Sequence, residues 1–146
     1  RAWLPMRFAA LCQEFVGGSR QFELGIESKA IRLNIVGSTG APGEATSTSA
    51  LVLSLDVAAI QAAIDGYGHH PRFIVLDSPR EADMEIGIFN RMMRRLASWH
   101  QASPVPVFQM IVTTTTRPHE TDVPADLVRL ELARVPEGDL LLGMEL

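Results

Sequence analysis

The first 36 residues carry two different hydrophobic periods, one typical of a helix and one typical of strands. Apolar side chains recur three or four positions apart in the first segment: Leu4, Phe8, Leu11 and Phe15. This spacing predicts a helix over residues 2–16 that ends at Gly17-Gly18. Residues 22–26 and 31–35 instead alternate apolar and polar positions. We therefore predict two strands that pair as an antiparallel hairpin.

A polar stretch then leads into an apolar one. Residues 37–49 contain only small, polar or turn-forming types, which predicts a loop without regular structure. Residues 50–64 are rich in Ala and Leu and predict a buried helix. Ser47, Thr48 or Ser49 is the natural N-cap of that helix, because a side-chain oxygen there accepts a hydrogen bond from a free amide of the first turn.

The second half of the chain alternates predicted strands and helices. Residues 72–77 form an apolar run that ends in an acid, which is typical of a parallel strand covered on both faces. A helix is predicted over residues 82–99, with acids near its start and arginines near its end. Further strands are predicted at 105–113, which is buried, at 128–132 and at 140–142. The order indicates an α/β fold, a mostly parallel sheet with flanking helices and an N-terminal antiparallel hairpin.

Composition narrows the functional classes. The 146 residues are 47% hydrophobic and 21% charged, which fits one compact domain. A single cysteine, Cys12, excludes an internal disulfide, and the histidines lack the spacing of zinc ligands. The net charge of -4 is unlike that of a free-standing nucleic-acid binder. Since no apolar run approaches the roughly 20 residues of a membrane span, we expect a cytoplasmic protein without a membrane partner.

Asp77 is the strongest candidate for chemistry. An apolar strand that delivers one Asp to its carboxyl end suits Mg²⁺ binding beside nucleotide phosphates. The alternative is that Asp77 only caps the helix that follows. The chain has no phosphate-binding P-loop of its own, because its only lysine, Lys29, lies between Ser28 and Ala30 and not in a Gly-Lys-Ser/Thr motif.

The order and spacing of these elements resemble a known family. Ser47-Thr48-Ser49-Ala50 precedes a long Ala/Leu helix, and the strand that ends at Asp77 follows. This layout resembles the C-terminal lobe of the ABC-type ATPase heads of SMC-like and DNA-repair coiled-coil ATPases. The four residues stand in the place of that family's Ser-Gly-Gly-Glu signature. On this resemblance, residues 1–18 are the end of a coiled-coil or connecting helix and residues 19–146 are the head lobe.

The resemblance implies an ATP-binding role for the residues around the predicted loop. Ser47 corresponds to the signature serine, which binds the γ-phosphate of ATP held by the opposing head. Thr48 and Ser49 follow it at the helix N-terminus, where free amide groups and the helix dipole favour an anion. A Ser/Thr N-cap after a surface loop is the simpler alternative. Thr113 or Thr114 is placed to sense the γ-phosphate, although threonines at a strand end also follow from strand propensity alone.

The resemblance also implies the groups that carry hydrolysis. Asp77 corresponds to the Walker B aspartate and is the expected Mg²⁺ ligand. The family places its catalytic glutamate next, where this sequence has Ser78. Glu81 is then the candidate that orients the attacking water, with a simple helix-dipole role as the alternative. Asp83 falls near the family's D-loop acid, which contacts the opposite ATP site of the dimer.

Three arginines share a face near the end of the predicted helix 82–99. Arg91, Arg94 and Arg95 are candidates for contacts with DNA phosphates or with a coiled coil. The alternative is a solvated last helical turn, in which cations complement the helix dipole.

Two functional hypotheses follow. The first is the C-terminal half of an SMC-like ATPase, inactive alone, which binds ATP and Mg²⁺ between two dimerised heads in DNA repair, chromosome maintenance or defence against foreign DNA. Its partners are an N-terminal P-loop lobe on the same or a separate chain, a second identical head and DNA. Because the sequence starts at Arg1, we expect it to be a piece of a longer protein. The second hypothesis is a non-enzymatic α/β protein-interaction domain. The first requires Asp77 and Ser47 to lie at exposed edges, whereas the second tolerates their burial.

Overall fold

The protein has a mixed α/β fold. In a computed structural model of the chain, the described residues are 3–18, 20–36, 44–79, 84–105, 107–115, 118–119 and 121–128, with the backbone alone over 44–48. Their elements in order are α1 (Trp3–Val16), β1 (Gln21–Ile26), β2 (Ile31–Val36), α2 (Glu44–Ile64), β3 (Phe73–Asp77), α3 (Ile86–Ala102), β4 (Gln109–Thr113) and the short 3₁₀ helix η1 (Ala125–Leu127). The antiparallel pair β1–β2 and the parallel pair β3–β4 confirm the predicted α/β class and hairpin.

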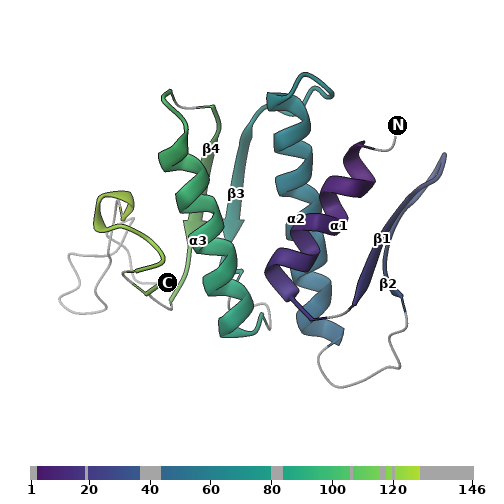
Figure 1. The fold of residues 1–146 in the computed structure, drawn as a ribbon, viewed down its shortest axis with the longest axis horizontal. Coiled ribbons are helices and arrows are strands. Elements are labelled where there is room, and N and C mark those ends of the chain that lie inside the picture. Colours follow the sequence, from purple (N-terminus) through teal and green to yellow (C-terminus); the bar gives the residue numbers. More distant parts are fainter. Residues whose placement is uncertain are drawn as a thin grey trace, which may run out of the picture.

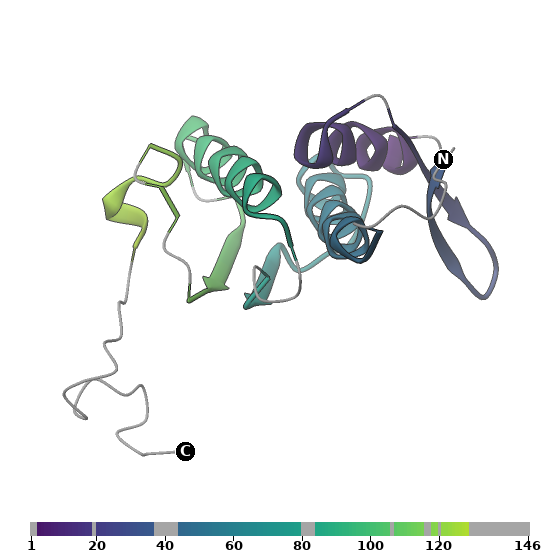
Figure 2. The same cartoon turned by 90° about the horizontal axis from the view of Figure 1, so that it is seen from below.

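The elements lie in two layers with the hairpin at one end. Helix α2 lies between α1 and β3 (Figure 1). Seen from below, α1 and α3 form one layer, and α2, β3 and β4 lie beneath it (Figure 2). The core occupies the space between these layers and extends under the hairpin. Within the described residues, no helix is both long enough and apolar enough to cross a bilayer.

Helix α1 and the hairpin form as the hydrophobic pattern predicts. The buried residues of α1 follow the helical period: Phe8, Leu11, Cys12 and Phe15. The helix ends at Gly17, whose φ of 76° suits glycine and whose amide donates to the carbonyl of Gln13 at 3.0 Å. In the hairpin, the cross-strand pairs Phe22–Ile35 and Leu24–Leu33 share one face, and that face packs on α1.

Helix α2 begins earlier than predicted. The expectation of a loop through residue 49 was wrong, because α2 starts at Glu44. Glu and Ala at its start favour helix, and lengthening a helix costs less than nucleating one. Ser47, Thr48 and Ser49 therefore lie inside the helix and are not its N-cap.

The parallel pair is covered on one face only. β3 and β4 pair in the predicted parallel sense, and Ile74 and Leu76 face the core. The prediction of burial on both faces was wrong, because Phe73, Val75 and Ile111 are 44%, 51% and 44% exposed. Helices lie on one side of the pair in Figure 2. An apolar run reveals what a strand can contact, whereas its burial depends on which elements lie above and below it.

The remaining boundaries differ from the prediction at both ends of the second half. α3 begins at Ile86 rather than at residue 82, because Glu85 in an extended conformation (φ -59°, ψ 136°) precedes it. β4 begins at Gln109, four residues after the predicted start at 105. Val128 directly follows η1, and the rest of the predicted strand 128–132 and the strand 140–142 lie outside the described residues.

Candidate functional site

The parallel register brings Asp77 and Thr113 side by side. Asp77 is the last residue of β3 and Thr113 is the last residue of β4, and the two are direct partners in the ladder. Both strands run in the same direction, so both residues lie at the carboxyl edge of the pair (Figure 1). Both side chains are exposed, on the face that the helices leave uncovered. The position of Asp77 was predicted from the sequence, whereas Thr113 was interpreted there only as a phosphate sensor.

Two hydroxyl groups converge on one oxygen of the Asp77 carboxylate. The Thr113 hydroxyl donates to Asp77 Oδ1 at 2.6 Å, and the Ser78 hydroxyl donates to the same oxygen at 3.3 Å. Asp77 does not cap α3, because the N-cap position of α3 is Glu85, where no side-chain cap bond forms. The capping alternative for Asp77 was therefore wrong.

The backbone turns sharply just after Asp77. Ser78 has a φ of 47°, in the left-handed region that residues other than glycine rarely occupy. Its amide donates both to the carbonyl oxygen of Thr113 and to the Thr113 hydroxyl, each at 3.1 Å. Thr113 thus holds both the carboxylate of Asp77 and the turn that follows it. Such strain persists where surrounding contacts fix the local backbone, and it is common at functional sites.

The donor set at this edge fits a hard cation such as Mg²⁺. A carboxylate and hydroxyl groups offer only oxygen, which Mg²⁺ prefers, and the exposed position leaves room for water and phosphate ligands. Within the described part of the chain, no donor contacts the second carboxylate oxygen of Asp77. Nor do the described residues contain a group of three or more His, Cys, Asp or Glu that could enclose a metal ion. A cation at Asp77 therefore takes its remaining ligands from water, and in an assembled site also from a nucleotide or from another lobe.

The other predicted site residues are not joined to Asp77 by the described contacts. Glu81 and Asp83 lie outside the described residues. Ser47 and Thr48 belong to the start of α2, where the backbone alone is described, and Ser49 is half-buried. Since the free amides of a helix belong to its first turn, which starts here at Glu44, the amides of Thr48 and Ser49 are not free for an anion.

Thr114 lies just beyond the end of β4. Its side chain is half-buried and already has an interaction partner in the protein. Thr113, one residue earlier, is the threonine that contacts Asp77. Two parallel strands that end in polar residues at equivalent positions are the signal that could have identified this pair from the sequence.

Arg91 is an internal contact between the two halves of the molecule. Its Nε donates to the carbonyl of Phe15 at 2.7 Å and its Nη2 to the carbonyl of Val16 at 3.2 Å. These carbonyls end α1, where the helix dipole is negative and the last acceptors lack partners within the helix. Arg91 therefore caps α1 from α3, a role that no local sequence pattern could reveal.

The other two arginines of α3 also have partners inside the chain. Arg94 Nε lies 2.7 Å from Asp122 Oδ1, and the Asp122 side chain is only 5% exposed. Arg95 Nε lies 3.5 Å from Glu14 Oε1 on α1. The predicted arginine patch thus binds neighbouring elements. The Arg94 side chain is 63% exposed and the Arg95 side chain 34%.

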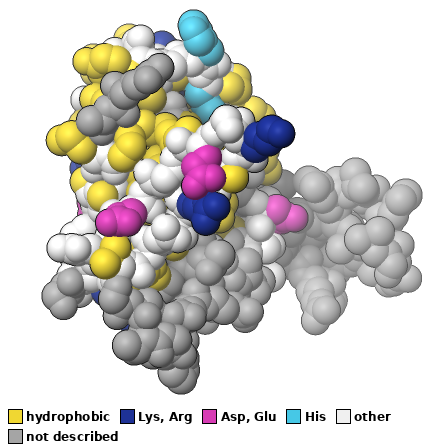
Figure 3. Space-filling model, turned by 90° about the vertical axis from the view of Figure 1, so that its right-hand side faces the viewer, with side chains coloured by type: hydrophobic (Ala, Val, Ile, Leu, Met, Phe, Trp, Pro, Cys, Tyr) yellow, Lys and Arg dark blue, Asp and Glu magenta, His cyan; other side chains and the backbone are white. Residues whose placement is uncertain are grey.

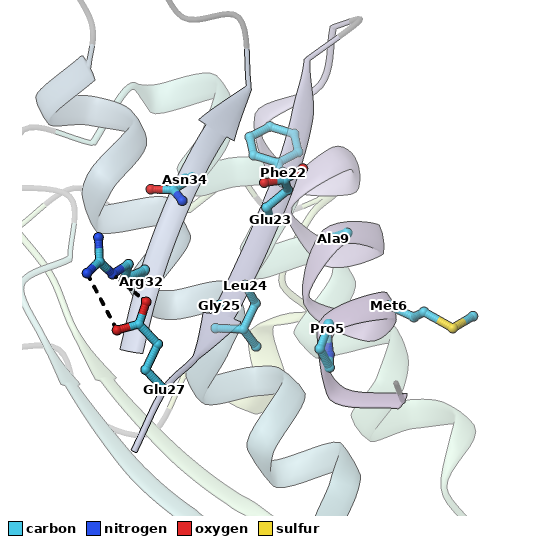
Figure 4. A pocket seen from close by; sticks show the side chains of 10 residues that line it. All are labelled: Pro5, Met6, Ala9, Phe22, Glu23, Leu24, Gly25, Glu27, Arg32 and Asn34. Carbon is cyan, nitrogen blue, oxygen red and sulfur yellow. Dashed lines mark hydrogen bonds and ion pairs between the residues drawn. The ribbon is translucent and has the colours of Figure 1, made fainter. Parts of the chain in front are cut away.

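A shallow groove lies between α1 and the hairpin, across α2 from the β3–β4 pair. Its volume is about 530 Å³, and Figure 4 shows Pro5 of α1 facing Leu24 of β1, while the Met6 side chain points away from the hairpin. The ion pair between Arg32 Nε and Glu27 Oε1, at 2.9 Å, lies at its edge. On this side of the molecule, hydrophobic side chains are mixed with charged ones, and an acidic and a basic side chain touch near the centre of the view (Figure 3). None of the predicted site residues lines this groove.

Comparisons with known proteins add no assignment to this geometry. No protein-family model matches the chain, and no curated protein matches it.

Proposed function

We propose that the chain is the C-terminal lobe of a cytoplasmic, SMC-like ATPase head in which Asp77 holds Mg²⁺ beside ATP. The observation that carries the proposal is the exposed Asp77 carboxylate at the carboxyl edge of a parallel strand pair. The apolar outer face of this pair gives further support, because parallel strands normally belong to larger sheets that are covered on both faces. In the proposal, an N-terminal lobe on the same or a separate chain completes the sheet and supplies the P-loop.

The groups at the carboxyl edge have separate roles in this proposal. Mg²⁺, when bound with ATP, neutralises the charge that develops on the phosphates during transfer. Asp77 is suited to orient the ion, since one of its oxygens accepts both hydroxyl bonds and no described donor contacts the other. The Ser78 hydroxyl donates to Asp77, so it is a poor candidate for the base that activates water. Hydrolysis then depends on Glu81, or the head hydrolyses ATP slowly and acts as a nucleotide-gated clamp.

The remaining partners are part of the same proposal. Ser47 contacts the γ-phosphate of ATP held by a second, identical head, Thr114 senses the γ-phosphate, and Asp83 contacts the opposite ATP site of the dimer. DNA is the expected target of the assembled heads. Since Arg91 and Arg95 are half-buried and contact α1, a DNA contact through α3 rests on Arg94, whose side chain is 63% exposed beside its partner Asp122.

The experiment that tests the proposal uses the native protein recovered from its source. We expect a polypeptide with a Gly-x-x-x-x-Gly-Lys-Ser/Thr motif, either continuous with this sequence or co-purifying with it. Asp77→Ala in that assembly should lower ATP hydrolysis by about a hundredfold, as expected for loss of a group that holds transition-state charge in place. Asp126→Ala removes an exposed acid of η1 and is the matched control, with activity unchanged. Absence of a P-loop partner, or full activity of Asp77→Ala, would refute the proposal.

A non-enzymatic interaction domain is the second candidate function. The observation that favours it is the same uncovered face, where Phe73, Val75 and Ile111 offer apolar surface to a partner protein. Here Asp77→Ala leaves partner binding unchanged, whereas Val75→Glu abolishes it. In the ATPase proposal Asp77→Ala is the variant that fails in the assembled protein, so the two substitutions distinguish the candidates.

A further inference from the structure

We infer that Thr113 is the positioning residue for the Asp77 carboxylate and sets which of its oxygens receives the cation. The inference rests on the proposed function, because it concerns the same Mg²⁺ site. It adds a residue to that site which the resemblance does not supply, since Thr113 was considered there only as a sensor of phosphate.

The geometry of the Thr113 hydroxyl supports this role. The hydroxyl donates its only hydrogen to Asp77 Oδ1 at 2.6 Å, and a hydroxyl bond to a carboxylate this short is of the strong, charge-assisted kind. The Thr113 hydroxyl oxygen in turn accepts a hydrogen bond from the Ser78 amide at 3.1 Å, which fixes the direction in which the hydroxyl hydrogen points. The hydroxyl therefore has one donor bond and one acceptor bond, and both join it to residues 77 and 78.

The backbone keeps these groups in register. The Ser78 amide also donates to the Thr113 carbonyl at 3.1 Å, so the parallel ladder continues one residue beyond Asp77. Ser78 adopts its left-handed φ of 47° at this point. With Oδ1 engaged by two hydroxyls, rotation of the carboxylate would break both bonds, and the second oxygen stays directed away from Thr113. A group that hydrogen-bonds a metal ligand in this way orients the ligand and tunes its affinity.

Threonine suits position 113 better than the chemically similar valine and serine do. Its β-branched side chain favours the strand, so the hydroxyl is presented from a stiff χ1 rotamer. Valine has nearly the same shape and strand preference but no hydroxyl. Serine retains the hydroxyl and loses only the methyl group. Thr113→Val and Thr113→Ser therefore separate the hydrogen bond from the shape of the side chain.

The test measures Mn²⁺ binding to the full 146-residue chain by NMR, with Mn²⁺ alone as the probe. Paramagnetic broadening of the Ser78 and Thr113 amide signals reports weak binding at Asp77, and broadening near Asp126 reports binding to an ordinary surface carboxylate. We expect Thr113→Val to raise the Mn²⁺ concentration needed at Ser78 by about tenfold, and Thr113→Ser to stay within about twofold of the parent chain. Asp77→Asn should reduce broadening at Ser78 to the level of other surface sites.

The outcomes separate this inference from the proposed function. If Asp77→Asn weakens binding but Thr113→Val binds as the parent chain does, or if Thr113→Val and Thr113→Ser weaken it equally, the positioning role is overturned and the cation site remains. If Asp77→Asn leaves broadening at Ser78 unchanged, or the parent chain shows none, the cation site of the proposed function is overturned. In that case, spectra of the Thr113 variants recorded without metal still test whether Thr113 positions the carboxylate. Thr113→Val should shift the Asp77 carboxyl ¹³C signal while Thr113→Ser preserves it, and unchanged Asp77 and Ser78 signals in Thr113→Val would overturn it.

Discussion

The two small sheets of this protein differ in the polarity of their outer faces. In the hairpin, the strands place Phe22 and Leu24 against α1, and their outer face is mostly polar, with Glu23, Arg32 and Asn34 beside the exposed apolar residue Val36. The parallel pair also turns one face to the core, but its outer face carries the exposed apolar residues Phe73, Val75 and Ile111. Antiparallel sheets commonly face water on one side, whereas parallel sheets are normally covered on both.

This difference indicates where each sheet leaves apolar surface exposed. In the hairpin, Phe22 and Leu24 are buried in the core shared with α1 and α2, whereas Ile26 and Ile31 at the tip of the same face stay 58% and 60% exposed. The parallel pair resembles the edge of a larger sheet, with the exposed Asp77 at the end where ligands of parallel sheets commonly bind. The candidate chemistry thus lies beside the exposed apolar face of the parallel pair.

The largest expected effect comes from truncating one phenylalanine in each sheet. Phe22→Ala should destabilise the fold by about 3–4 kcal/mol, because the Phe22 side chain is buried against α1. Phe73→Ala should cost about 1 kcal/mol, because nearly half of Phe73 already faces water. Urea unfolding of both variants measures the two costs. Equal losses would show that the outer face of β3–β4 is covered in solution, and the contrast between the sheets would fail.

Much of this contrast could be predicted from the sequence, and the rest depends on distant contacts. The periods of α1 and of the hairpin follow from Phe8, Phe15, Phe22 and Leu24, because each side chain has its direction set by its own element. The apolar run that ends at Asp77 predicted a strand and its edge correctly. It could not predict the uncovered face, since coverage is decided by elements elsewhere in the chain.

The same reasoning explains what was missed at the site and at the helix ends. The Asp77–Thr113 hydrogen bond joins residues that are 36 positions apart, and it depends on the parallel register of β3 and β4. The bond from Arg91 to Phe15 spans 76 positions. At the start of α2 the error was local, because a run of small polar residues was interpreted as a loop although Glu44 and its neighbours extend the helix.

Arg91 connects the two regions, so its removal tests whether they are stable independently. Arg91→Met removes two hydrogen bonds to the carbonyls of Phe15 and Val16 and should lower the free energy of unfolding by about 2–3 kcal/mol. Arg95→Met is the matched control on the same helix. Its 3.5 Å ion pair with Glu14 is partly exposed, so its loss should cost less than about 1 kcal/mol. Thermal unfolding followed by circular dichroism compares the two, and similar losses would contradict the capping role of Arg91.

A buried thiol between α1 and α2, in the half of the molecule that carries the hairpin, predicts that stability depends on pH. Burial raises the pKa of the Cys12 thiol from 9.0 to about 11, and the Ser54 hydroxyl opposes part of this rise. Because the folded-state pKa is raised, the thiol's contribution to stability is complete below pH 9 and is lost as the pH rises towards 11. Between these pH values, the parent chain should lose about 2 kcal/mol more than Cys12→Ala, in urea unfolding at each pH. Parallel pH curves for the two chains would place the thiol in contact with water.

Helix α2 borders both regions, and Asp56 on it gives the smallest predicted effect. Burial raises the pKa of the Asp56 carboxyl above 3.8, while attraction to His70 lowers it in part. A raised folded-state pKa means that this group favours folding below pH 3.8 and that the benefit is lost as the pH rises through the folded-state value. At pH 7 the folded protein therefore holds a carboxylate that would be better solvated in the unfolded chain. Asp56→Asn should raise stability at pH 7 by less than about 1 kcal/mol and have no effect near pH 3. Glu23→Gln, an exposed acid of the hairpin, is the control and should change neither value. A loss of stability at pH 7 would mean that the attraction between Asp56 and His70 outweighs the cost of burial, and that the loop before β3 is held to α2 by charge.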